Sequence, residues 1–251
     1  MDNMIENCKT PNDGLLCLWL PLYLKAQLIV TRPDVLMELL NTHSYDWEKS
    51  EGDRKLLEKT LGRGLVNVEG QEHKAMRKVV SPAFSGRQVR DLVPLFYEKG
   101  LAFADALAYA SDQSAEEGIE MMHQMSRVTL DIIGAAAVGQ DFNTIHNDQN
   151  RIAQLYAQIT DVNRGPLILF VLVQLFLPSW LIRNLKGTPY ARTANAQVEL
   201  RNEVRALMQA KKERYMEKGE SERDIIATIL RSGDFSDDYL VDQLLTFLAA
   251  G

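Results

Sequence analysis

The sequence predicts a mainly α-helical fold with a small β region near the N-terminus. From residue 71 onward the pattern is strongly helical, and no later segment shows the strand–helix alternation of a βαβ unit. Residues 28–30 read Leu-Ile-Val, and such branched apolar residues predict a strand. No regular repeat of roughly 20–50 residues is found, so the helices do not form a repeat array.

The expected elements follow in order along the chain. A helix is expected from Thr31 or Pro33 through Leu40, because proline suits the first helical turn. Residues 51–61 form either a short helix or a loop, and glycines then mark a loop at 62–70. The remaining expected helices cover residues 71–80, 87–110, 118–138, 147–162, 190–217, 222–231 and 237 to the end.

The composition is that of an ordinary globular protein. Its 251 residues are 46% hydrophobic and 25% charged, which excludes global disorder and low-complexity architectures. The net charge of −6 argues against a nucleic-acid partner, since phosphate contacts need a basic surface. The two cysteines, Cys8 and Cys17, are too few for a disulfide framework or a cysteine-based zinc site. We therefore expect a reducing compartment.

Residues 166–182 are almost entirely apolar. Only Gln174 and Ser179 are polar, and Pro178 interrupts the segment. A buried helix with its exit loop is the favoured interpretation, and a membrane-dipping element is the alternative, because crossing a bilayer takes about 20 residues. Residues 1–13 are polar and lack the pattern of a signal peptide.

One predicted helix carries a basic face. His73 and Arg77 are four residues apart and therefore share one side of the helix, while Met76 and Val80 form an apolar ridge on the opposite side. The guanidinium of arginine donates in a planar fork that suits carboxylates and phosphates. Taken alone, a solvated basic face is the simpler interpretation. The four histidines are too far apart for a local metal pair, so no metal site is expected.

The last predicted helix becomes apolar on all sides from Leu244. Such a helix belongs in the centre of a large protein, yet the sequence stops at Gly251, so this end looks cut. We expect the surface from Leu244 to Ala250 to lack part of its cover and the chain to be marginally stable, since total stability is only about 5–15 kcal/mol.

Four groups of residues stand in a telling order: 28–33 (LIVTRP), 61–78 with 82–85 (PAFS), 126–134 with 139–143 (SRVTLDIIG and GQDFN), and 244–251 (LLTFLAAG). In this order they resemble the cytochrome P-450 superfamily, in particular its fungal microsomal-type members. The resemblance implies an incomplete P-450 fold that runs from the B helix to the first half of the I helix. Residues 1–251 would then be the N-terminal portion of one domain that lacks the K helix and the heme-cysteine loop.

The resemblance also implies roles for particular residues. His73 and Arg77 match the C-helix positions that reach the heme propionates, with His in place of the family's usual Trp. Ala250 and Gly251 match the start of the oxygen-activation motif in the I helix. Phe170 and Phe247 are candidates for the substrate pocket, although core packing is the favoured role for either one.

The family's Glu-x-x-Arg pair and iron-binding cysteine have no match, because the string at 51–54 lies in the wrong region and both cysteines lie at the opposite end. Without a thiolate ligand we expect that heme is not stably bound. The expected function is a truncated, inactive monooxygenase. Its intact relatives would oxidise lipophilic small molecules in fungal secondary metabolism, with NADPH–cytochrome P-450 reductase as partner. A non-catalytic helical fragment that binds a membrane or a partner, and a partial gene model of an active enzyme, are the alternatives.

Whether this chain is itself an enzyme therefore stays open at this stage. The expected location is the cytoplasm or the periphery of the endoplasmic reticulum membrane, because no N-terminal anchor is found and residues 166–182 offer a membrane contact.

Overall fold

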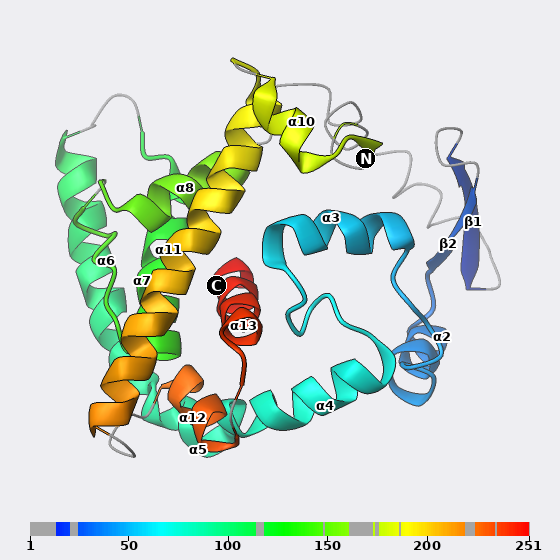
Figure 1. The fold of residues 1–251 in the computed structure, drawn as a ribbon, viewed down its shortest axis with the longest axis horizontal. Coiled ribbons are helices and arrows are strands. Elements are labelled where there is room, and N and C mark those ends of the chain that lie inside the picture. The colour runs from blue at the N-terminus through cyan, green and yellow to red at the C-terminus, as the bar shows by residue number, and fades with distance from the viewer. Residues whose placement is uncertain are drawn as a thin grey trace. The chain divides into compact units, whose positions relative to one another are not determined.

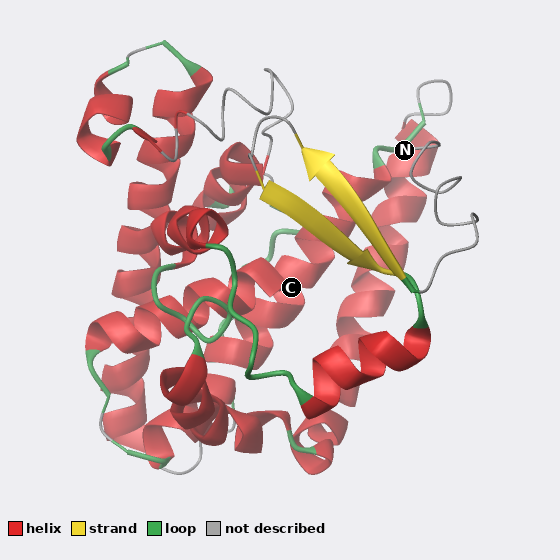
Figure 2. Ribbon diagram, turned by 90° about the vertical axis from the view of Figure 1, so that its right-hand side faces the viewer, coloured by secondary structure: helices red, strands yellow, loops and turns green. Residues whose placement is uncertain are grey.

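The computed structural model describes residues 14–20, 25–113, 118–147, 149–160, 173, 176–185, 187–218, 224–233 and 235–250. The chain forms two compact units, Met1–Lys49 and Ser50–Gly251. As the sequence predicts, helices dominate and strands occur only near the start of the described chain (Figure 2).

The first unit contains a β-hairpin followed by a short helical segment. Strands β1 (Leu15–Leu20) and β2 (Lys25–Val30) lie side by side (Figure 2). They pair antiparallel, with Leu15 opposite Val30. The predicted strand at 28–30 is thus confirmed, while β1 was not predicted, because the apolar run from 15 to 30 hides two strands. Helix α2 (Pro33–Met37) begins with the expected proline and continues into a π-helical turn, η1 (Glu38–Thr42).

Helices are the regular secondary structure in the described residues of the second unit (Figure 1). In chain order its elements are α3 (Glu51–Leu61), α4 (Gly70–Val80), the 3₁₀ helix η2 (Ser81–Phe84), α5 (Gly86–Asp91), α6 (Val93–Gln113), α7 (Met121–Val138), α8 (Arg151–Thr160), α10 (Ser179–Asn184), α11 (Pro189–Lys218), α12 (Ile225–Arg231) and α13 (Asp237–Ala250).

Capping side chains explain where several helices begin. The Ser50 side chain accepts a hydrogen bond from the Asp53 amide at 3.2 Å, so residues 51–61 form a helix rather than a loop. Asn150 accepts from the amides of Ile152 and Ala153, and α8 therefore starts later than the predicted residue 147. The Asp224 carboxylate accepts from the Ala227 amide at 2.9 Å and fixes the start of α12. The helix predicted at 87–110 is two helices, α5 and α6.

Helix α13 lies at the centre of the second unit. It contacts α11, α7 and α3 (Figure 1), and every residue from Leu240 to Leu248 is buried. The expectation that the surface from Leu244 onward lacks cover is wrong for residues 244–248, because helices that precede α13 in the sequence already surround it. In the described part of this helix, only Ala249 and Ala250 are exposed at its end.

The apolar segment at 166–182 lies largely outside the described residues. Within the part that is described, Phe176 and Trp180 are exposed, whereas Ile182 is buried in α10. The membrane contact proposed from the sequence stays a prediction. Across the residues that the structure describes, no helix combines the length and the apolar character needed to cross a bilayer.

Candidate functional site

Helix α4 presents the basic face that the sequence predicts. His73 and Arg77 lie one helical turn apart on α4, with His73 half-buried and Arg77 exposed. No carboxylate of the described residues forms an ion pair with Arg77, whereas Arg63 pairs with Glu72 at 2.7 Å. The Arg77 guanidinium is therefore available to an anionic group from outside the described chain.

An adjacent face of α4 is fixed to the core. The Val80 side chain is buried, and the Gln243 amide nitrogen lies 3.4 Å from the Met76 sulfur as a hydrogen-bond donor. Met76 and Val80 thus form the predicted apolar ridge, but it borders the side of α4 that carries His73 and Arg77 and does not lie opposite it, because an α-helix has about 3.6 residues per turn. Because one face is held by α13 and the core, the basic face is presented in a defined orientation rather than on a loosely attached helix.

The loop at residues 62–68, which we call the clamp loop, joins α3 to the segment before α4 and lies on α13. The Leu65 amide donates to Gln243 Oε1 at 3.3 Å, and Asn67 Nδ2 donates to the Gly62 carbonyl at 3.1 Å. Gln243 therefore binds the clamp loop through its oxygen and α4 through its nitrogen. Sequence analysis missed this junction of the clamp loop, α4 and α13. Two signals of it are present in the sequence: the paired glycines, Gly62 and Gly64, and the polar Gln243 in an apolar helix.

The other predicted site residues lie in different surroundings or outside the described residues. Phe247 is only 5% exposed and its ring lies 5.7 Å from that of Phe84, centroid to centroid, so its position is that of a core residue. Ala250 is the last described residue of α13. Phe170 and Gly251 lie outside the described residues, and their predicted roles stay predictions.

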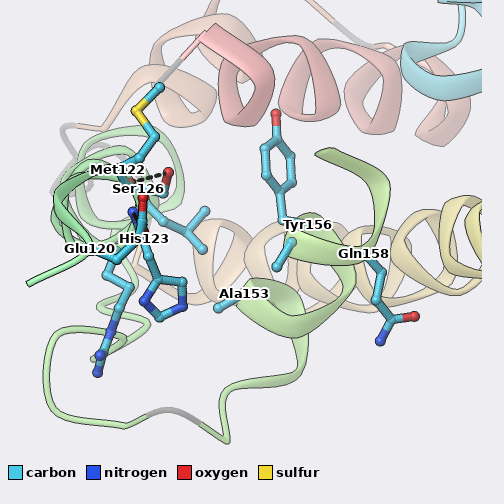
Figure 3. A pocket seen from close by; sticks show the side chains of 10 residues that line it. Glu120, Met122, His123, Ser126, Ala153, Tyr156 and Gln158 are labelled. Atoms are coloured by element: carbon cyan, nitrogen blue, oxygen red, sulfur yellow. Dashed lines mark hydrogen bonds between the residues drawn. The ribbon is translucent and has the colours of Figure 1, made fainter. Parts of the chain in front are cut away.

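A pocket of about 740 Å³ lies between α7 and α8 (Figure 3). His123 and Ser126 reach it from α7 and Tyr156 from α8, while the labelled Gln158 side chain points away from the α7 residues (Figure 3). Sequence analysis did not identify this pocket, because its two walls are separated in the chain by the end of α7 and the start of α8. Neither His73 nor Arg77 lines it.

The chemistry of this pocket is limited. Burial raises the pKa of Tyr156 to about 12, so its phenol stays neutral near pH 7. The Arg127 guanidinium donates to the carbonyls of Thr144 and Ile145, which fixes it to the loop after α7. The described residues hold no cluster of His, Cys, Asp or Glu that could bind a metal ion. The described lining of this pocket can accept an apolar group.

Comparisons with known proteins agree with one another. The sequence profile of the family described as "Cytochrome P450" matches residues 14–251. Cytochrome P450 monooxygenase FUM15 of Gibberella moniliformis is 35% identical, and the match covers 90% of this chain and 39% of that protein. Cytochrome P450 monooxygenase sphH of Aspergillus fumigatus is 34% identical, with 99% of this chain and 47% of that protein covered. The chain thus spans less than half the length of these two relatives.

A solved structure shows the same likeness of fold. The crystal structure of the cytochrome P450DA heme domain matches 99% of this chain with a TM-score of 0.74, and the match covers 51% of that chain. The sequences are only 16% identical, so this similarity concerns the fold alone.

Proposed function

The chain belongs to the cytochrome P450 family, and we propose that it is the propionate-binding portion of a fungal monooxygenase that oxidises lipophilic small molecules. The observation that carries this proposal is the basic face of α4, with Arg77 exposed beside half-buried His73 on a helix anchored to the core.

The residues of α4 fit the carboxylate end of a heme. Arg77 is exposed and has no carboxylate partner among the described residues, so a heme propionate can accept from its guanidinium. His73, one turn earlier, supplies a ring nitrogen on the same side of α4. When bound, heme supplies the iron at which the family activates oxygen. The contribution of α4 is to bind and orient the macrocycle.

An axial ligand for the iron is a separate requirement. The sequence contains two cysteines, Cys8 and Cys17, and the second unit has none. Cys17 is an exposed free thiol of β1. We therefore propose that this chain orients heme through its propionates but does not supply the thiolate, so that oxidation requires residues beyond those of this sequence.

The substrate class follows from the relatives. Those reported above are fungal cytochrome P450 monooxygenases, and we propose a lipophilic substrate from secondary metabolism, with NADPH–cytochrome P450 reductase as electron donor. The clamp loop and α13 are the described segments that would border the substrate. A non-catalytic role in binding a membrane or a partner is the alternative, and the exposed Trp180 and Phe176 favour it.

The proposal is tested by heme titration of the 251-residue chain, followed by Soret absorbance and tryptophan quenching. Arg77→Met should weaken heme binding by about tenfold or more, since hydrogen bonds to charged groups are the stronger ones. The matched control is Lys78→Met, which removes an exposed cation from the adjacent position of the same helix and should change the dissociation constant by less than about twofold.

A second ligand makes the test specific for the carboxylates. With the dimethyl ester of heme, whose propionates are neutral, wild type and Arg77→Met should bind equally. Equal weakening by Arg77→Met and Lys78→Met would contradict the proposed contact. Absence of heme uptake by the wild-type chain would instead favour the non-catalytic binding role.

A further inference from the structure

Asp242 is an acidic residue in the middle of the buried stretch of α13. Its side chain is 11% exposed, and its neighbours on both sides in the sequence, Val241 and Gln243, are fully buried. Removing a carboxylate from water is unfavourable unless it is paired and hydrogen-bonded. The contacts that compensate Asp242 therefore indicate what this residue holds in place.

Each oxygen of the Asp242 carboxylate binds a different element. Oδ2 accepts the backbone amide of Arg63, in the clamp loop, at 2.8 Å. Oδ1 accepts a guanidinium N–H of Arg201, on α11, at 2.5 Å. One carboxylate thus joins the clamp loop, α11 and α13, although Arg63 and Asp242 are 179 positions apart in the sequence.

The clamp loop lies so close to α13 that two of its positions have no room for a side chain. A Cβ built on Gly64 would come well within 3.0 Å of Thr246 Oγ1, and one built on Gly62 would meet the Asp242 carboxylate. Gly62 also has a φ of +69°, a backbone conformation that residues with a side chain rarely adopt. The backbone itself therefore rests on the helix, and its amides are presented to Asp242 and Gln243.

We propose that Asp242 is a positioning residue that sets where the clamp loop lies over α13, with Arg201 supplying the positive charge that stabilises the buried carboxylate. This inference rests on the proposed function, in which the clamp loop and α13 border the substrate. Asp242 then controls the shape of that border without contacting substrate, because it holds the loop backbone rather than a side chain. Loss of the carboxylate releases the loop while the surrounding helices stay packed.

The test is peptide-resolved hydrogen exchange on the 251-residue chain, compared at matched protein stability. Asp242→Ala should raise exchange of the clamp-loop amides about 10- to 100-fold, the effect of losing a hydrogen bond to a charged acceptor, while α7 exchanges as in the wild type. Asp242→Asn retains an oxygen that can accept from the Arg63 amide, and it should give a smaller increase. This graded rescue would not follow from a general loss of stability.

The matched control lies one turn earlier on the same helix. Asp238 pairs with Arg205 of α11 at 2.8 Å but is 73% exposed, and Arg205 lies outside the clamp loop. Asp238→Ala should leave clamp-loop exchange within about twofold of the wild type. Arg201→Met combined with Asp242→Ala should be no worse than Asp242→Ala alone, because Arg201 acts through the carboxylate.

Three results would overturn the inference: clamp-loop exchange in Asp242→Ala within twofold of the wild type, an equal increase in Asp238→Ala, or an increase shared by α7. Hydrogen exchange requires no heme. Failure of heme binding would therefore contradict the proposed function while leaving this measurement interpretable, and a failure here would leave the α4 contact intact.

Discussion

Helices α13 and α6 are both rich in apolar residues, but they occupy opposite environments. Every residue of α13 from Leu240 to Leu248 is buried. Along α6, by contrast, Val93, Tyr97 and Leu101 are 53%, 69% and 52% exposed. Helix α13 contacts α11, α7 and α3, whereas α6 contacts α7 and α5 and runs along the outside of the second unit (Figure 1).

The difference shows that apolar composition alone does not determine burial. A helix is covered when elements elsewhere in the chain fold around it, and α13 has such elements on several sides. The exposed side chains of α6 recur every four residues at 93, 97 and 101, so they form a stripe on one face rather than scattered apolar positions. Such stripes are typical of surfaces that another element or partner covers.

The largest expected effect comes from shortening a core side chain of α13. Leu244 is fully buried, and Leu244→Ala should lower the free energy of unfolding by about 2–5 kcal/mol, because a cavity remains. Leu101→Ala makes the same chemical change on α6, where the side chain is 52% exposed, and should cost less than about 1 kcal/mol. Urea unfolding followed by circular dichroism measures both. Equal losses in the free energy of unfolding for the two variants would contradict the difference in burial between α13 and α6.

A smaller effect, of opposite sign against α13 and within α6, is expected for glycine substitutions. Gly64→Ala places a methyl group against Thr246 of α13 and should destabilise the chain by about 1–3 kcal/mol. Gly100 lies within α6 and a Cβ there meets nothing within 4 Å, so Gly100→Ala should stabilise by about 0.5–1 kcal/mol. The melting temperatures of the two variants should move in opposite directions. A fall in both would show that α6 is packed more tightly than its exposure indicates.

The smallest effect concerns the ion pair between Lys99 of α6 and Asp141, which follows α7. Burial opposes the charge of Asp141, but hydrogen bonds from Lys99 and the Asn143 amide, with the charges of Lys99 and His146, outweigh it and hold the pKa of Asp141 below its usual value. Because the folded-state pKa lies below the unfolded one, this contribution is present above about pH 4 and lost as the pH falls through the folded-state value.

Replacing Lys99 should remove this dependence of stability on pH. Lys99→Met should be less stable than the wild type above about pH 4, by at most about 1 kcal/mol because Asp141 is half exposed to screening solvent, and the two should converge as the pH falls through the folded-state pKa of Asp141. Lys78→Met alters an exposed lysine of α4, and it should leave the dependence of the melting temperature on acidic pH unchanged. The same dependence of melting temperature on acidic pH in Lys99→Met and in the wild type would contradict the role assigned to Lys99.

The sequence predicted features that depend on neighbouring residues. The four-residue spacing of His73 and Arg77 sufficed to place them on one face of α4, and the apolar ridge of Met76 and Val80 followed from the same periodicity. The strand β1 was missed because a hairpin can be hidden within one apolar run. Features that depend on contacts between distant residues could not be predicted. No local pattern shows that α13 would be covered, or that Asp242 would accept the Arg63 amide.

Arg63 and Asp242 are far apart along the chain, and this separation determines when their contact can form during synthesis. A ribosome that adds about 5–20 residues per second needs on the order of ten to forty seconds to make the 179 positions that separate them. Until α13 emerges, the nascent clamp loop has neither its carboxylate acceptor nor the helix surface on which its glycines rest. This junction therefore forms only after α13 has emerged, and until then the clamp loop is open to proteases and chaperones.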